Sequence, residues 1–165
     1  MNMRSLGLDV GGRRTGVAIS DPLGVLALPL TVIDRKETEE ALAEIVKLVR
    51  QYRVECIVVG LPYSLEGHLT AEAEKVKAFT EKLRDALAAG GDSEPSRVSI
   101  QMWDERLSTV TAERLMIEAK TRKDRRAQHR DAIAAAIVLQ GFLDNRHSES
   151  FATAQGRLRE GEEPK

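Results

Sequence analysis

The 165-residue chain has few of the features that mark a secreted, membrane-bound or zinc-binding protein. It has one cysteine, Cys56, so it cannot form an internal disulfide, which fits a reducing cytosol. We find no apolar run long enough to span a membrane and no secretory signal pattern, and we therefore expect a cytoplasmic protein without a membrane partner. Its three histidines are scattered, and no histidine or cysteine cluster has the spacing of a zinc site. The formal net charge of −1 does not by itself suggest a nucleic-acid partner, so the placement of charge matters more.

Hydrophobic periodicity predicts a mixed α/β fold. Apolar runs indicate five strands, over 6–10, 15–20, 25–33, 55–61 and 98–103. Helical spacing indicates four helices, over about 37–52, 70–89 and 108–119 and from about 128 onward. We expect the first three strands to be antiparallel and the last two to pair in parallel through crossover helices, with the first strand between the second and the fourth and the fifth strand outside the fourth. Residues 1–144 form one predicted domain, and the polar segment 145–165 is predicted to be a disordered tail.

Asp9 lies at the end of the first predicted strand, before a turn rich in glycine and arginine. Successive side chains of a strand point to opposite faces, so Asp9 shares a face with Gly7. A carboxylate at the end of an apolar strand is costly unless it is paired, and Gly11, Gly12 and Gly16 leave room for a ligand to approach the backbone. Two interpretations stay open: Asp9 holds a metal ion, or it caps the loop by accepting bonds from nearby N–H groups.

Two further acids can reach the same sheet edge. Glu105 follows the fifth predicted strand, and Asp131 lies on the first turn of the last predicted helix, on the face that carries Ala135 and Val138. Asp131 could instead serve the helix N-terminus, which favours negative charge. Three acids brought together would repel one another, and a hard divalent cation such as Mg²⁺ would remove that conflict. Two such ions about 4 Å apart can hold both the attacking water and the leaving oxygen of a phosphodiester.

A basic run precedes Asp131. Its cations, set against the single acid Asp124, are Lys120, Arg122, Lys123, Arg125, Arg126 and Arg130. A charge run of this kind is usually a solvated face, but this one leads directly to a proposed metal ligand. A phosphate backbone attracted to the run would arrive beside that site.

Four blocks of sequence together resemble the YqgF/RuvX family of bacterial RNase H-like nucleases, whose members are described as pre-16S rRNA nucleases or as Holliday junction resolvases. The blocks are 8–21, 58–62 with Gly67, 104–109, and Arg122-Lys123 followed by 131–140. The resemblance covers roughly residues 4–144. It implies an RNase H-like fold, dependence on Mg²⁺ or Mn²⁺, and Asp9, Glu105 and Asp131 as the catalytic, metal-binding acids. Asp104 is a weaker candidate than Glu105, because only one of two successive strand residues should point into the site.

The resulting hypothesis is a metal-dependent nuclease that processes the 5′ end of pre-16S rRNA. Water would attack phosphorus in line, leaving a 5′-phosphate, and Arg13, Arg14, Lys123 and Arg126 would position the nucleic-acid backbone. The alternatives are a Holliday junction resolvase acting on branched DNA, which would need a homodimer to cut two strands symmetrically, and a non-catalytic nucleic-acid-binding factor. An actin-like ATPase is disfavoured, because the chain has no second copy of the first hairpin. Nothing in the sequence separates RNA from DNA as the substrate.

Overall fold

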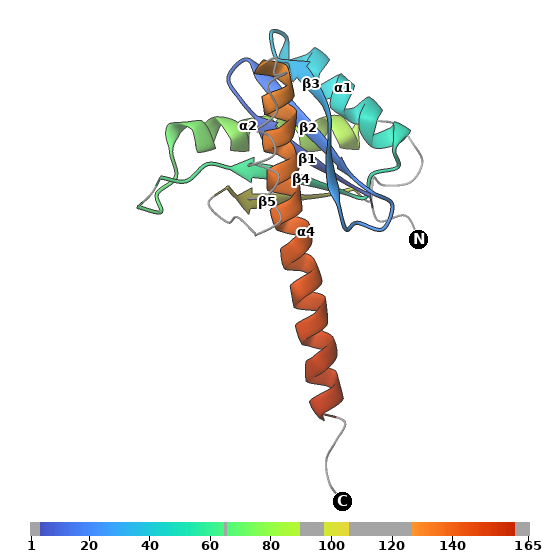
Figure 1. Cartoon of the computed structure of the whole chain (residues 1–165). Helices are drawn as coiled ribbons and strands as arrows, with labels where there is room; N and C mark the ends of the chain where they lie inside the picture. The colour runs from blue at the N-terminus through green and yellow to red at the C-terminus, as the bar shows by residue number, and fades with distance from the viewer. Residues whose placement is uncertain (1–3, 65, 90–97, 106–126, 161–165) are drawn as a thin grey trace, which may run out of the picture.

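The computed structural model describes residues 4–64, 66–89, 98–105 and 127–160. Figure 1 shows a twisted sheet crossed by one long helix. The elements described are β1 (Ser5–Val10), β2 (Arg14–Ser20), β3 (Ala27–Asp34), α1 (Thr38–Gln51), β4 (Cys56–Leu61), α2 (Ala71–Ala88), β5 (Ser99–Asp104) and α4 (Ala127–Glu160). The helix predicted over 108–119 lies outside the described residues.

The strand order is β3-β2-β1-β4-β5, as the sequence predicts. The first three strands are antiparallel neighbours, whereas β4 runs parallel to both β1 and β5. Strand β1 is therefore central, and its carboxyl end lies at the same edge as the carboxyl ends of β4 and β5. That edge is where open α/β sheets commonly place their sites.

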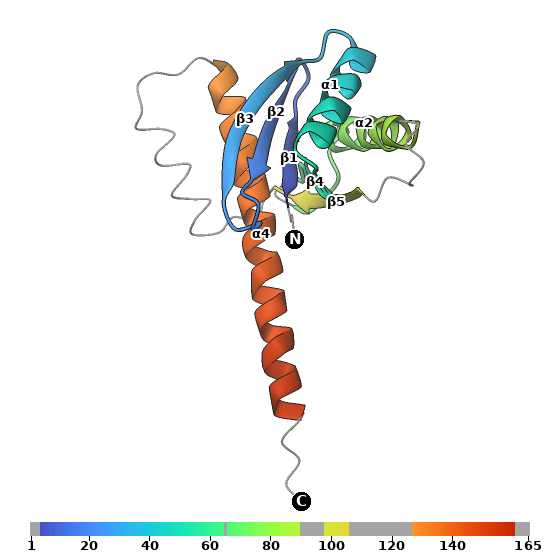
Figure 2. The same cartoon turned by 90° about the vertical axis from the view of Figure 1, so that its right-hand side faces the viewer.

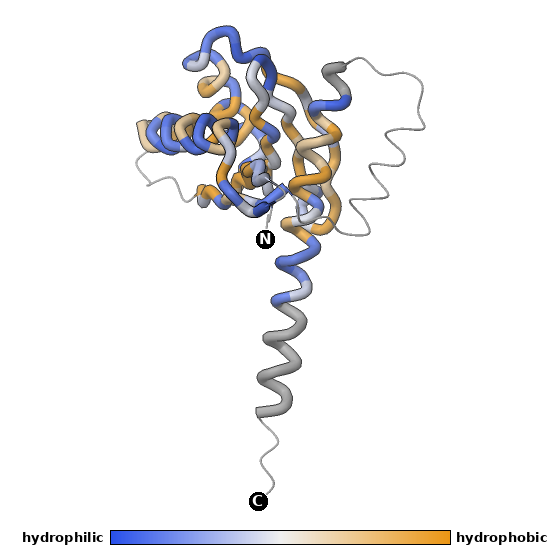
Figure 3. The backbone as a smooth tube through the Cα atoms, turned by 90° about the vertical axis from the view of Figure 1, so that its left-hand side faces the viewer, coloured by the Kyte–Doolittle hydropathy of each residue, from blue (hydrophilic) through white to orange (hydrophobic). Residues whose placement is uncertain are grey.

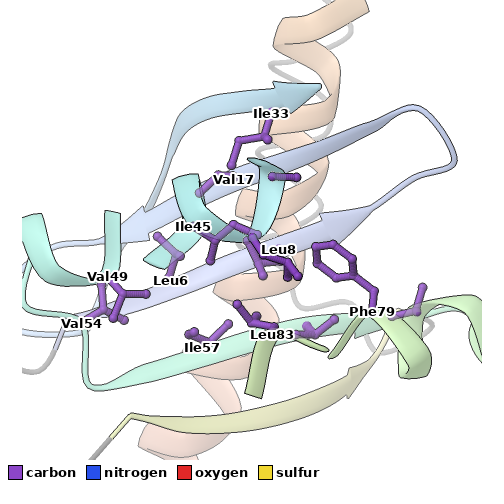
Figure 4. Close-up of a cluster of buried hydrophobic side chains, with 14 of the residues drawn as sticks. Leu6, Leu8, Val17, Ile33, Ile45, Val49, Val54, Ile57, Phe79 and Leu83 are labelled. Carbon is purple, nitrogen blue, oxygen red and sulfur yellow. The ribbon is translucent and has the colours of Figure 1, made fainter. Parts of the chain in front are cut away.

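Helices cover both faces of the sheet. Figure 2 shows α1 and α2 on one side and α4 on the other. Alternation along β1 divides its side chains accordingly: Leu6 and Leu8 are fully buried in the cluster with α1 and α2 drawn in Figure 4, and Gly7 faces α4. The α4 face has a second cluster, in which Ala18 and Val58 of the sheet pack with Leu139. Asp9, two residues after Gly7, belongs to the α4 face.

Residues 145–160, predicted to be a disordered tail, lie in α4, which the structure continues to Glu160. Helix α4 is largely hydrophobic beside the sheet and becomes hydrophilic where it first leaves the sheet (Figure 3). The polar composition of this segment does not exclude a helix, because many polar residues are good helix formers. Two side-chain contacts support the part of α4 that leaves the sheet. Asn145 Nδ2 donates to Glu149 Oε1 at 3.2 Å, and His147 Nε2 lies 2.9 Å from the Gly24 carbonyl oxygen.

The hairpin between β2 and β3 anchors α4 through a buried glutamine. Gln140 Oε1 accepts from the Ala27 N–H at 2.9 Å, and Gln140 Nε2 donates to the Val25 carbonyl at 3.0 Å. Strand β3 begins at Ala27 and not at the predicted residue 25, because the Val25 and Leu26 N–H groups bond to Asp21 Oδ1 within the turn. In the part of the chain that the structure describes, no helix is long and apolar enough to cross a membrane.

Candidate active site

Asp9 has a glycine beside it on each neighbouring strand. Asp9 pairs with Gly16 of β2, and Leu8 pairs with Val59 of β4, so Gly60 lies next to Asp9 on the other side. Residues side by side in a sheet point to the same face, and this row faces α4. Because glycine has no Cβ, the sheet leaves space above the backbone on both sides of the Asp9 carboxylate.

The backbone of Asp131 fills the space above Gly16. A Cβ at Gly16 would lie 1.8 Å from the Asp131 carbonyl oxygen and 2.4 Å from its carbonyl carbon. A Cβ at Gly7 would likewise lie 2.7 Å from Leu139 Cβ and 2.9 Å from the Ala135 carbonyl oxygen. These two glycines therefore let α4 rest directly on β1 and β2, which brings Asp131 beside Asp9. The expectation that Gly16 leaves room for a ligand is wrong, because α4 occupies that room.

The carboxyl group of Glu105 fills the space above Gly60. Its Oε1 lies 2.7 Å from the position that a Gly60 Cβ would take. The Glu105 N–H donates to the Leu61 carbonyl at 3.2 Å, which continues the pairing of β4 with β5 by one residue. Glu105 thus lies on the same face as Trp103. The Trp103 ring packs edge-on against the Phe142 ring of α4, with the two ring centroids 5.8 Å apart. Strand alternation selects Glu105 over Asp104, as the sequence predicts.

The carboxyl groups of Asp9 and Glu105 interact with each other through a side-chain hydrogen bond. Burial raises the pKa of Glu105 to about 7, and the neighbouring Asp9 carboxylate contributes to this rise. Burial also raises the pKa of Asp9, and repulsion from Asp131 adds to it against the lowering effect of the Glu105 hydrogen bond. Although Glu105 is exposed as a whole residue, its carboxyl end lies over the sheet and is partly desolvated.

Asp131 is paired with Arg14. The Arg14 Nε lies 3.1 Å from Asp131 Oδ2, and the two side chains remain 40% and 34% exposed. The contact is an ion pair without the geometry of a hydrogen bond: Oδ2 is buried and has no hydrogen-bond partner. An ion pair this exposed contributes only about 0–1 kcal/mol, so Asp131 can exchange Arg14 for another cation at low cost.

The structure thus brings together the three predicted acids, in two pairs that share Asp9. Among the described residues, no three acid, histidine or cysteine side chains converge closely enough to enclose one metal ion together. Of the predicted nucleic-acid contacts, Arg13 is exposed at the hairpin tip and Arg14 forms the ion pair with Asp131. Lys123 and Arg126 lie outside the described residues.

The acid set fits a divalent cation. All three donors are carboxylate oxygens, which Mg²⁺ and Mn²⁺ accept, and Mg²⁺ needs only one or two carboxylates because it keeps several waters and binds substrate phosphates. The raised pKa values of Asp9 and Glu105 are the mark of a site in which negative charge is poorly compensated. A cation would supply that compensation. The same arrangement can bring a phosphate group to an activated water.

The raised pKa of Glu105 predicts that the cation-free protein loses stability as the pH rises. The folded pKa of about 7 exceeds the ordinary 4.5, so the folded state holds more protons between these pH values. The free energy of unfolding should therefore fall from pH 5 to pH 7 and level off above it. Allowing for solvent screening at this exposed residue, we expect a loss of about 1 kcal/mol, or about 2–4 °C in Tm.

Thermal unfolding in EDTA across this pH range measures the effect. The side chain of the matched variant Glu105→Gln cannot ionise. The fall in Tm between pH 5 and pH 7 should therefore be about 2–4 °C smaller in this variant than in the wild type. Identical pH profiles for the two proteins would contradict the assigned pKa.

A family model described as "RuvX: Holliday junction resolvase" matches residues 3–145. A protein of Clostridium novyi (strain NT) named "Putative pre-16S rRNA nuclease" is 43% identical over 143 residues, which cover 87% of this chain and 99% of the relative. A protein of the same name from Desulforamulus reducens is 41% identical over 143 residues, covering 87% of this chain and 98% of that protein.

Two solved structures that match the fold of this chain are junction resolvases. Thermus thermophilus RuvC in complex with a Holliday junction substrate superposes with a TM-score of 0.55 at 18% identity, covering 88% of this chain and 96% of RuvC. The yeast mitochondrial Holliday junction resolvase Ydc2 gives a TM-score of 0.50 at 12% identity, covering 86% and 78% of the two chains. Identities this low establish only the fold, and they confirm the predicted RNase H-like architecture.

Proposed function

Because this chain belongs to the YqgF/RuvX family, we propose that it is a divalent-metal-dependent nuclease that hydrolyses phosphodiester bonds in the cytoplasm. The observation that carries the proposal is the row Gly16-Asp9-Gly60, which seats Asp131 on one side of Asp9 and Glu105 on the other. The names of the curated relatives favour precursor 16S rRNA as the substrate.

Each acid has a separate role in the proposed site. Asp9, between the other two, would contact both of two ions, while Glu105 and Asp131 would each complete the coordination of one. When bound, the cations supply Lewis-acid activation of water and neutralise charge on the scissile phosphate. The three carboxylates would hold the cations at the carboxyl edge of β1, where the phosphate backbone of the substrate can reach them. Glu105, whose pKa is raised to about 7, would have to be ionised to hold a cation, because ligands of hard cations are ionised carboxylates.

The arginines of the first hairpin, Arg13 and Arg14, would balance negative charge at this site and contact the substrate. Without a cation, Arg14 balances the charge of Asp131. If Asp131 held a cation, the Arg14 guanidinium would be available to bind a phosphate of the substrate. Arg13, exposed at the hairpin tip, and Lys123 and Arg126 are proposed to position the backbone further along the strand.

The description of the matching family favours a second candidate, cleavage of four-way DNA junctions. A resolvase cuts two strands symmetrically, so this activity would require two copies of the chain acting as a homodimer. The two candidates share the same acids and the same cation. They differ in the substrate that the exposed surface around Arg13 accepts.

One preparation tested on two substrates decides between the candidates. A precursor 16S rRNA leader and a synthetic four-way DNA junction are each incubated with the protein in Mg²⁺, in Mn²⁺ and in EDTA. The proposal predicts cation-dependent cutting of the RNA leader at defined positions. Paired cuts in the junction alone would establish the resolvase alternative. Binding without cutting of either substrate would overturn the nuclease assignment in favour of a non-catalytic factor.

A further inference from the structure

A cavity of about 270 Å³ lies at the end of β1 on the face opposite to the acids. Its wall includes the hairpin turn, the residue that follows β3, and one face of α2. The residues that matter here are Gly11, Gly12, Arg35, Lys75, Phe79 and Lys82. Together with Glu72, the lining carries three cations and one carboxylate. Its formal charge is therefore +2, whereas the formal net charge of the whole chain is −1.

Arg35 is fixed in this wall by a hydrogen bond and a ring contact, and no counter-ion for it is found among the described residues. Its Nη1 donates to the Gly11 carbonyl at 2.6 Å, and its guanidinium carbon lies 4.5 Å from the centre of the Phe79 ring. The Nε is buried and has no acceptor, and in the described part of the chain no carboxylate forms an ion pair with Arg35. Burial correspondingly lowers the pKa of Arg35, because the environment does not compensate its charge. A bound anion would provide the missing compensation.

Two lysines extend the positive wall along α2. Lys75 and Lys82 are seven residues apart, which places both on one face of the helix. Lys75 lies 3.7 Å from Glu72 in an exposed and therefore weak ion pair, and no ion pair of Lys82 is found among the described residues. Both ammonium groups can turn toward a ligand in the cavity. A guanidinium, two ammonium groups and a glycine turn form a set of donors suited to a phosphate.

We propose that this cavity binds a phosphate group of the nucleic-acid substrate and so holds the strand across the end of β1. The inference rests on the proposed nuclease function. Asp9 and Val10 are successive residues of β1 and point to opposite faces, so the acids and the cavity lie on the two sides of one strand end. A nucleic-acid strand that crosses this edge can contact both. The cavity then offsets the repulsion between the acid cluster and the phosphate backbone.

The test compares two double variants that remove the same charge from the same helical layer. The cavity variant, Lys75→Ala/Lys82→Ala, removes the two lysines that line the cavity. The control, Lys47→Ala/Lys77→Ala, removes two exposed lysines that do not line it. Arg35 is left unchanged, because its loss would also alter the Gly11 turn. Binding of a fluorescent single-stranded RNA is measured by anisotropy in EDTA, where no cutting occurs, over a range of salt concentrations.

We expect the cavity variant to bind about tenfold more weakly and its slope of log K against log salt to become shallower by about 1.4. The control should bind within about twofold of the wild type. An unchanged slope and affinity in the cavity variant would overturn the proposal. A parallel titration with AMP distinguishes a strand phosphate from a free nucleotide. Binding of AMP that is lost in the cavity variant, with RNA binding unaffected, would overturn the assignment to the strand.

Cleavage in Mg²⁺ separates this inference from the function on which it rests. If the wild type cuts and the cavity variant binds RNA as the wild type does, the phosphate site is refuted and the nuclease assignment stands. If the wild type binds without cutting and the cavity variant loses affinity, the nuclease assignment fails and the phosphate site stands.

Discussion

Replacing Asp9 with asparagine should reduce cation-dependent cleavage by about a thousandfold or more and leave the fold intact. Loss of one group that stabilises charge in a transition state costs about 10²–10³-fold, and Asp9 is shared by both proposed ion positions. Asparagine has almost the same shape, so the glycines on either side of it still fit. The change also removes a negative charge from a crowded cluster. We therefore expect the cation-free variant to be at least as stable as the wild type.

Single-turnover cleavage and thermal unfolding in EDTA measure these two effects together. Asp85→Asn, an exposed position on α2 far along the chain from the acids, provides a control with the same chemical change. Its cleavage rate should match that of the wild type. If Asp9→Asn cuts within tenfold of the wild-type rate and keeps the same cation requirement, Asp9 is not a ligand in the active site.

Replacing Gly16 with alanine should destabilise the protein by about 3 kcal/mol or more and abolish cleavage as well. The added Cβ would overlap the backbone of Asp131, which cannot move aside as a flexible side chain could. Overpacking usually costs about 1–3 kcal/mol, and this overlap is severe. To relieve it, α4 must lift from β2, which carries Asp131 away from Asp9. Stability and activity are therefore lost through one displacement.

Urea unfolding measures the stability change, and Gly12→Ala serves as its control. Gly12 lies in the same hairpin, but a Cβ there has no atom within 4 Å, so its unfolding midpoint should differ little from that of the wild type. If Gly16→Ala unfolded at the wild-type midpoint, the seating of α4 on β2 would be contradicted, and with it the account of how Asp131 reaches the site.

The sequence was sufficient to predict the sheet and the positions of the acids. Crossover helices required parallel pairing, which placed β1 next to β4 and gathered the carboxyl ends of three strands at one edge. Alternation along β5 then selected Glu105 over Asp104. These predictions rely on backbone geometry, which periodicity encodes directly.

Contacts between distant side chains could not be predicted in the same way. The pairing of Arg14 with Asp131 depends on how deeply α4 sits on the sheet, and that depth is set by two glycines whose partners are far along the chain. The positive cavity around Arg35 depends on the stacking of its guanidinium on Phe79 of α2. No local pattern marks either contact. The length of α4 was missed for a different reason, because the polar composition of its last turns excludes a core but permits a helix.

The central claim is that Asp9, Glu105 and Asp131 bind divalent cations together, and Mn²⁺ binding followed by calorimetry tests it most directly. The wild type should show saturable binding that Asp9→Asn nearly abolishes and that Glu105→Gln and Asp131→Asn each weaken by at least about tenfold. Wild-type affinity for Mn²⁺ in all three variants would contradict the claim.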